Sequence, residues 1–223
     1  MSGPGKKRLV ALGCRAFKGD GAVVGVSFDD RKPRVVCSTF LATAVEGDRL
    51  SFEPYQVASE MKRGPHGEAS LEAAAAVAEG RKRQDSLAAA GLDKIKKGLR
   101  SSGSEPVIAA LLINRAGWMT DLLAYSLAFP DHPPVAEGLA VRKAFRFALG
   151  EVGLKAVELD EKSLSEQASK AFDLSPTELD VRLKALGALV GRPWRKEQKL
   201  ACLAAWVAIA PLTGGGREPE QAR

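Results

Sequence analysis

The spacing of apolar residues changes near residue 68, and this change constrains the fold more than any other feature of the sequence. Before it, residues 9–17, 22–28 and 35–43 are short runs rich in Val, Leu and Phe, as expected of strands. The segments between them, KGDG and DDRKP, are dense in turn residues and short enough for hairpins. The sequence therefore predicts an antiparallel meander of three strands.

Beyond this point the spacing becomes helical. Residues 68–100 are rich in Ala, with apolar or small residues recurring at the helical period, and they predict one long amphipathic helix. A continuous apolar run at 105–114, flanked on its N-terminal side by Gly and Ser, predicts a buried strand. The other predicted elements are helices at 118–129, 135–149, 161–172, 176–190 and 196–210, a proline-rich loop at 130–134 and a short strand at 153–159.

The predicted helix at 176–190 has the clearest end signals. Ser175, Pro176 and Glu178 supply an N-cap, a first-turn proline and the acid of a capping box. Gly191 stands where a glycine commonly ends a helix. The bounds of this helix are therefore predicted from side-chain chemistry as well as from periodicity.

Composition and charge restrict the class of protein. The chain has 223 residues, of which 45% are hydrophobic, as expected of one compact core. Its 33 Lys and Arg residues exceed its 27 Asp and Glu residues, and the net charge of +6 permits nucleic acid as a partner. The apolar runs are shorter than the roughly 20 residues that span a bilayer, and no signal segment is recognisable. We expect a cytoplasmic protein that does not bind membranes, with a flexible basic N-terminus at 1–8, a single domain at 9–211 and a disordered tail at 212–223.

Cysteine and histidine offer little ligand or nucleophile chemistry. Cys14, Cys37 and Cys202 cannot all pair and show no CxxC spacing, so buried, reduced thiols are expected. His66 and His132 lie in proline-containing segments and are expected on the surface. No GxxxxGK[ST], GxSxG or HExxH string occurs, which removes three common catalytic or nucleotide-binding motifs.

The predicted order is three hairpin strands, a helix, a strand, a helix, a strand and further helices. This order resembles that of ribonuclease H-like domains, and the resemblance implies an α/β fold of that class with extra C-terminal helices. In such nucleases and resolvases, carboxylates hold two divalent ions about 4 Å apart. Hard oxygen ligands of this kind suit Mg²⁺, and Mn²⁺, which accepts similar ligands, is the other candidate metal.

The resemblance also implies candidate residues for a metal-dependent phosphodiesterase. Glu137 and Glu197 each lie in the first turn of a predicted helix, where such domains place acids after the fourth strand and at the head of the final helix. They are therefore the candidate catalytic residues and metal ligands. Acids in first turns also stabilise a helix by interacting with its dipole, without binding a ligand. A purely structural role for both glutamates therefore stays open.

The first predicted strand departs from the pattern of such centres. A resolvase-like LGxD motif would place its essential Asp after the Leu-Gly pair at 12–13, where this chain has Cys14 and Arg15. The centre therefore lacks its expected acid. An anion site becomes an alternative to a metal site, with candidate phosphate-holding residues Arg15, Arg142 and Lys199.

Basic residues on the long predicted helix form a second candidate site. Arg81, Lys82, Lys96 and Lys97 could contact the phosphates of a nucleic acid along one stripe. Acidic residues are interspersed among them, so a solvated surface of mixed charge is the alternative. The helix is a candidate nucleic-acid surface on this basis.

Several stretches resemble an uncharacterised bacterial protein family. Its PYHxA segment corresponds to residues 54–58, its HAAEGELFRxAL helix to the region around Glu137, and its terminal PPWxxDQKxAALAAWLALA helix to 192–210. Where that family has histidines, this chain has Phe17, Gln56 and Pro134. The family carries no assigned reaction, so the resemblance implies matching positions and no mechanism.

Two functional hypotheses follow. The first is a ribonuclease H-like protein that binds nucleic acid and cleaves it with Mg²⁺ or Mn²⁺, favoured by the element order and by the positions of the two glutamates. The second is a catalytically inactive protein of the same fold that serves as a binding or scaffold module. The missing acid on the first strand and the missing histidines favour the second hypothesis.

Overall fold

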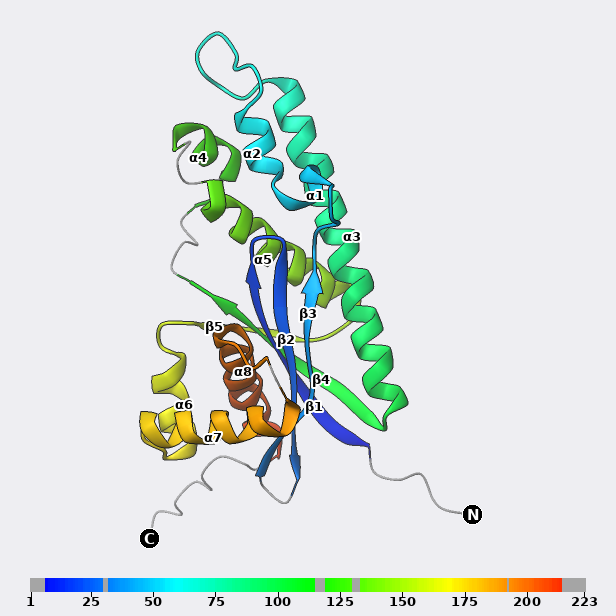
Figure 1. The fold of residues 1–223 in the computed structure, drawn as a ribbon, viewed down its shortest axis with the longest axis vertical. Helices are drawn as coiled ribbons and strands as arrows, with labels where there is room; N and C mark the ends of the chain where they lie inside the picture. Colours follow the sequence, from blue (N-terminus) through cyan, green and yellow to red (C-terminus); the bar gives the residue numbers. More distant parts are fainter. Residues whose placement is uncertain (1–6, 30–31, 115–118, 130–132, 192, 214–223) are drawn as a thin grey trace.

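A mixed β-sheet forms the centre of the molecule (Figure 1). The computed structural model describes residues 7–29, 32–114, 119–129, 133–191 and 193–213. Within these residues five strands lie side by side in the order β3-β2-β1-β4-β5. Their bounds are β1 Arg8–Phe17, β2 Asp20–Asp29, β3 Lys32–Ala42, β4 Ser104–Ile113 and β5 Ala156–Asp160.

The pairing of the strands follows the predicted topology. β1, β2 and β3 pair antiparallel as a meander, whereas β4 pairs parallel with β1 and β5 pairs parallel with β4. The predicted meander and the two helix-connected strands are therefore confirmed. Parallel pairing places the C-terminal ends of β1, β4 and β5 at one edge of the sheet.

The helices of the described chain differ from the prediction mainly at their ends. Their bounds are α1 Arg49–Phe52, α2 Pro54–Ser59, α3 Leu71–Ser101, α4 Leu122–Ala128, α5 Pro133–Glu151, α6 Leu164–Phe172, α7 Pro176–Val190 and α8 Lys196–Thr213. The bounds and the capping box of α7 are confirmed, and Gly191 follows it at a φ of 90°. The short helices α1 and α2 were not predicted.

Side-chain caps explain where α3 and α4 begin. The Ser70 hydroxyl accepts a hydrogen bond from the Ala73 amide, so α3 starts three residues after the predicted start at 68. The Asp121 carboxylate accepts from the Leu123 and Ala124 amides, so α4 starts at Leu122 rather than at 118. Trp118, the predicted start, lies outside the described residues.

Prolines are tolerated in two helices where the prediction had placed ends. α5 starts at Pro133, so the predicted loop at 130–134 is wrong for Pro133 and Pro134, and 130–132 lies outside the described residues. Proline fits the first turn of a helix because the amide it lacks has no partner there. α8 continues through Pro211 to Thr213, past its predicted end at 210, and 214–223 lies outside the described part of the chain.

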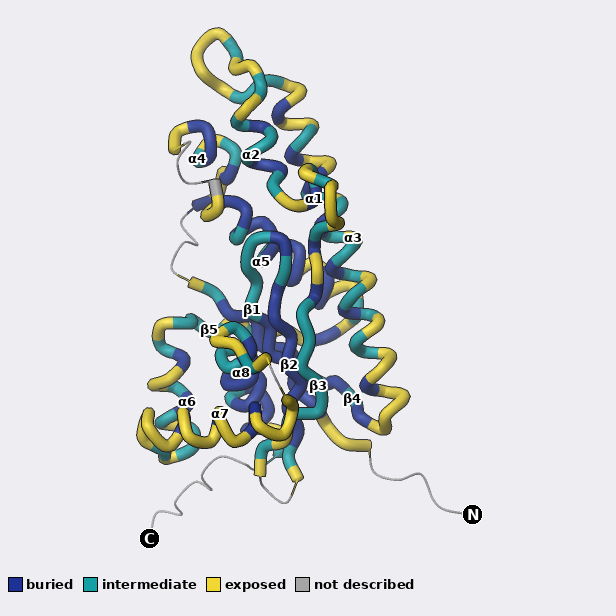
Figure 2. The backbone as a smooth tube through the Cα atoms, viewed as in Figure 1, coloured by how far each residue is buried: buried dark blue, intermediate teal, exposed yellow. Residues whose placement is uncertain are grey.

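Helices cover both faces of the sheet. α8 packs on one face against β1, β2 and β4, with α6 and α7 beside it, and α3 and α5 pack on the other. The dark blue segments of Figure 2 show that much of β1, β2 and β4 and the body of α8 are buried. α2 and α4 lie with α3 and α5 beyond the end of the sheet and share a smaller core with them, and α1 packs against α2 and α3 (Figure 1). Within the described residues no helix has the length and apolar content needed to span a membrane.

The contact between β1 and α8 is unusually close at Gly13. A Cβ added to Gly13 would lie 1.7 Å from the carbonyl oxygen of Ala201 and 2.9 Å from the amide nitrogen of Ala205. Only glycine leaves room for this backbone approach. The head of α8 is therefore held beside the C-terminal end of β1.

Replacing Gly13 with Ala tests this contact. The added methyl group collides with the Ala201 backbone, so we expect the free energy of unfolding to fall by about 3 kcal/mol or more. Gly98→Ala is the matched control, because Gly98 is an exposed residue of α3 with nothing within 4 Å of an added Cβ. The control should gain up to about 1 kcal/mol. Urea unfolding followed by circular dichroism measures both, and equal stability of the two variants would contradict this packing.

Candidate functional site

Charged side chains from four elements meet at the edge where the parallel strands end. We call this group the strand-end cluster. It consists of Arg15 from β1, Arg142 and Arg146 from α5, Glu158 on β5, Glu161 just after β5, and Glu197 from the first turn of α8. Ligands of open α/β sheets commonly bind beyond the carboxyl ends of parallel strands, so this edge is the first place to seek a site.

Arg15 is the centre of the strand-end cluster. Its Nε and Nη2 atoms each donate a hydrogen bond of 3.0 Å to the Glu161 carboxylate, and its Nη1 lies 3.7 Å from Glu197 Oε1. A bidentate guanidinium–carboxylate pair is among the stronger charge-assisted interactions in proteins. Only 21% of the Arg15 side chain is exposed, so water screens the pair weakly. One guanidinium thus joins the end of β5 to the head of α8.

The residues at this edge do not fit a two-metal centre. Arg15 stands where the LGxD pattern would place its acid, and its positive charge already neutralises Glu161 and contacts Glu197. A divalent ion needs several free oxygen ligands, and a guanidinium beside them opposes a second cation. In the described part of the chain, no group of three or more His, Cys, Asp or Glu side chains is arranged to hold a metal.

Glu137 lies in a different environment from Glu197. It is fully buried on α5, and its Oε1 accepts 2.9 Å hydrogen bonds from the backbone amides of Tyr55 and Gln56 in the first turn of α2. Its Oε2 is buried with no hydrogen-bond partner among the described residues. Burial raises the pKa of this carboxyl to about 7, although the two backbone hydrogen bonds oppose that rise. Glu137 therefore fastens α2 to α5, and its catalytic or metal-binding role stays a prediction.

Arg142 lies in the strand-end cluster with Arg15, whereas Lys199 lies outside it. Arg142 Nη1 donates a 2.9 Å hydrogen bond to Asn114 Oδ1 just beyond β4, and its Nε is buried without a partner in the described residues. Burial and then nearby Arg146 lower its pKa. Lys199 is two residues from Glu197, which places it on the opposite side of α8, near Asp180 of α7. Of the three predicted anion-holding residues, the structure thus brings two together.

The four predicted stripe residues on α3 have different surroundings. Lys97 forms an ion pair of 2.6 Å with Asp93 on its own helix, and Lys96 donates to the Val152 carbonyl after α5. Lys82 is exposed, and Arg81 lines a pocket beside α5. Two of the four cations are therefore engaged by the protein, and a continuous phosphate-binding stripe stays a prediction.

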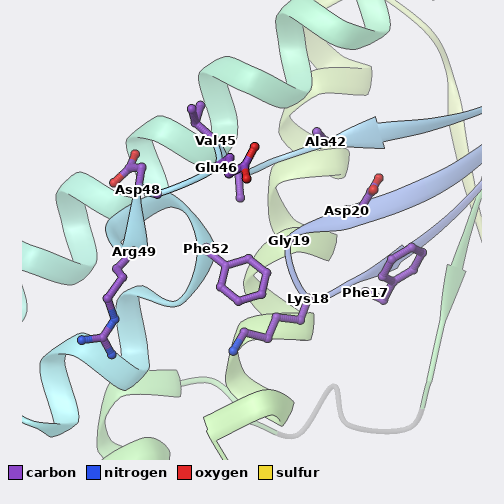
Figure 3. Close-up of a pocket in the computed structure, with 12 residues that line it drawn as sticks. Phe17, Lys18, Gly19, Asp20, Ala42, Val45, Glu46, Asp48, Arg49 and Phe52 are labelled. Carbon is purple, nitrogen blue, oxygen red and sulfur yellow. The ribbon is translucent and has the colours of Figure 1, made fainter.

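The tip of the β1–β2 hairpin forms a pocket of about 490 Å³ with the end of β3 and α1 (Figure 3). The Lys18 ammonium lies 4.4 Å from the centre of the Phe52 ring and donates a 2.8 Å hydrogen bond to Glu53. Arg49 binds Glu53 and Glu60. Both cations among the described lining residues thus have acid partners. Sequence reasoning missed this pocket because α1 was not predicted.

The cysteines and histidines add no chemistry to these sites. Cys14 and Cys202 are buried and Cys37 is half-buried, and all three are free thiols. Burial, followed by the charge of Cys37, raises the pKa of Cys14 to about 12, so its thiolate is disfavoured. His66 is exposed, as expected, and His132 lies outside the described residues.

Comparison with known proteins identifies the class of fold. No protein-family model matches the sequence, and no curated protein matches it significantly. The structure of Thermus thermophilus RuvC is similar with a TM-score of 0.52 and 12% identity, over 93% of this chain and 98% of that chain. RuvC of the same organism in complex with Holliday junction substrate gives a TM-score of 0.53 with the same identity and coverage. Identity this low shows the fold alone, and the predicted ribonuclease H-like fold is confirmed.

Glu137→Gln tests the role of the buried carboxyl. The folded state raises the pKa from 4.5 to about 7, so the native protein retains the proton over this interval while the unfolded chain releases it. Stability therefore falls as pH rises through this interval, by on the order of 3 kcal/mol once pH exceeds the folded pKa. Glutamine does not titrate and still offers an oxygen to the two amides.

Urea unfolding at pH 5 and pH 8 measures this effect. The Glu137→Gln variant should lose less stability than the wild type between the two pH values, and Glu46→Gln, at an exposed position, should behave like the wild type. An identical pH dependence in Glu137→Gln and wild type would show that Glu137 does not titrate as its burial implies.

Proposed function

We propose that this chain is a ribonuclease H-like protein that binds nucleic acid without cleaving it. The observation that carries the proposal is the bidentate pair between Arg15 and Glu161, with Glu197 at 3.7 Å, at the edge where a two-metal centre would need free acids. In this proposal Arg15, rather than divalent ions, balances the negative charge of the acids at this edge.

The chemistry of the guanidinium favours binding over hydrolysis. Divalent ions in nuclease centres lower the pKa of a bound water and so generate the attacking hydroxide. A guanidinium donates hydrogen bonds to phosphate oxygens, but it offers no coordination site for a water. Arg15 thus takes the place of the ions as the partner of the acids, and it omits the group that would generate the attacking hydroxide.

Arg142 supplies the contact to the ligand in this proposal. Among the described residues it has no carboxylate within ion-pair distance, whereas Arg15 and Arg146 are paired with Glu161 and Glu158. Its buried Nε leaves one donor unused. RuvC, which shares the fold, has been observed with Holliday junction substrate, and the net charge of +6 also suits a polyanion.

Fluorescence anisotropy with a labelled four-way DNA junction and a matched duplex tests binding. We expect log affinity to fall linearly with log salt between about 50 and about 200 mM, because bound phosphates release counterions. Arg142→Gln should weaken binding and reduce the magnitude of the slope by about 1. Lys170→Gln removes the same charge from an exposed position on α6 and should leave both quantities unchanged.

The same DNA substrates test the absence of cleavage. With Mg²⁺ or Mn²⁺ present, we expect junction and duplex to stay intact under conditions in which a control nuclease cuts them. Metal-dependent cleavage that Glu197→Gln abolishes would overturn the proposal and favour a phosphodiesterase that uses Glu137 and Glu197. Absence of binding at every salt concentration would remove nucleic acid from the proposal.

A further inference from the structure

A second basic site lies away from the strand-end cluster, where α2, α3, α4 and α5 pack together beyond the end of the sheet (Figure 1). These helices and the residues just before α4 line an open pocket of about 400 Å³. The polar side chains that line it are Tyr55, Arg81, Thr120, Asp121 and Lys143. Pockets of this size accept small ligands in many proteins.

The two cations of this pocket differ from most others on the same helices. Arg81 extends from α3 and Lys143 from α5, and both are half-buried. In the described part of the chain, neither has a carboxylate within ion-pair distance or a hydrogen-bond partner. By contrast, Arg83 and Lys97 on α3 have acid partners, as do Lys18 and Arg49 in the pocket of Figure 3.

The acids near the pocket offset only part of its positive charge. Asp121 directs its carboxylate to the amides of Leu123 and Ala124 at the start of α4. Asp85 lies one turn beyond Arg81 on α3, and Arg81 only partly offsets the rise in its pKa that burial causes. Burial lowers the pKa of Lys143, and the neighbouring positive charge of Arg81 lowers it further, whereas the charge of Asp121 opposes part of this change. Two like charges thus share a pocket, and a bound anion would relieve their repulsion.

Tyr55 offers a third donor to the same pocket. Its side chain is almost fully buried, and its hydroxyl has no hydrogen-bond partner among the residues that the structure describes. Burial raises its pKa to about 12 despite the opposing charge of Arg81, so the phenol keeps its proton at neutral pH. The backbone amide of Tyr55 donates to Glu137, which holds the start of α2 against α5.

We propose that this pocket binds a phosphate group, held by the Arg81 guanidinium and the Lys143 ammonium, with the Tyr55 hydroxyl as a third donor. A phosphate monoester carries close to two negative charges at neutral pH, which matches the two cations. Guanidinium and phosphate also match in hydrogen-bond geometry. The phosphate belongs either to a free nucleotide or to the terminal phosphate of a nucleic-acid strand. Neither Arg81 nor Lys143 belongs to the strand-end cluster, so this site is independent of the proposed function.

Isothermal titration calorimetry of the full chain at low ionic strength tests this site. The probes are inorganic phosphate, adenosine 5′-monophosphate and adenosine, together with one oligonucleotide carrying either a 5′-phosphate or a 5′-hydroxyl. We expect adenosine 5′-monophosphate to bind if the ligand is a free nucleotide, and the 5′-phosphorylated oligonucleotide to bind if the ligand is a strand end. Arg81→Gln and Lys143→Gln should each lower the affinity for the bound probe about tenfold, as for loss of one charged hydrogen bond. Lys94→Gln, an exposed position farther along α3, should leave the affinity unchanged.

The arms of the experiment separate the two sources of phosphate. Binding of adenosine 5′-monophosphate but not adenosine supports a free nucleotide, and preference for the 5′-phosphorylated oligonucleotide supports a strand end. Tyr55→Phe keeps the buried ring and should lower the affinity for the same probe. Because this change removes only a hydroxyl group, it tests the site even if the charge variants fail to fold. Under the proposed function Arg142→Gln weakens both oligonucleotides alike, so it should leave the preference for the 5′-phosphate unchanged, which separates the site from the strand-end cluster.

Two results would overturn the proposal. One is the absence of binding for every phosphate-bearing probe to the folded wild-type chain. The other is binding that neither Arg81→Gln nor Lys143→Gln weakens while circular dichroism shows both variants to be folded.

Discussion

The close contact of β1 with α8 determines where the charged groups of this molecule meet. At Gly13 the carbonyl oxygen of Ala201 occupies the space that any larger residue would fill. This contact brings the first turn of α8 to the end of β1, so Glu197 approaches Arg15. The body of α8 is buried, which explains why a largely apolar helix begins with charged residues. Only its head reaches the edge of the sheet.

The strand-end cluster lies where α/β proteins commonly bind ligands, but most of its charged side chains pair with one another. The pairs of Arg15 with Glu161 and of Arg146 with Glu158 link α5, β1 and the end of β5. Such pairs fix the geometry of the edge because each guanidinium is held by a planar carboxylate. The fold is that of ribonuclease H-like proteins. In our proposal the Arg15 side chain, instead of a coordinated metal, holds the acids at the centre of the site.

Much of the fold could be predicted from local patterns. The meander follows from short apolar runs and turn residues, and α7 follows from its capping residues. The prediction failed for α1 and α2, because helices of four and six residues are too short to show a period. It also failed at Pro133, where a proline begins a helix rather than ending one.

The site was harder to predict because its contacts join distant parts of the chain. Arg15 and Glu161 are 146 residues apart, and no local pattern pairs them. Glu137 binds amides 81 and 82 residues away, so its burial could not be seen in the sequence. Lys199 and Glu197 are close in sequence yet lie on opposite sides of α8. The candidate residues were chosen by helix position, whereas the three-dimensional packing decides which of them meet.

Direct titration with Mn²⁺, followed by electron paramagnetic resonance of the free ion, tests the central claim that Arg15 takes the place of metal. The account predicts that the wild-type chain leaves added Mn²⁺ free, because the Arg15 guanidinium is paired with Glu161 and lies 3.7 Å from Glu197. Tight, stoichiometric Mn²⁺ binding to the wild type that Glu197→Gln removes would contradict it.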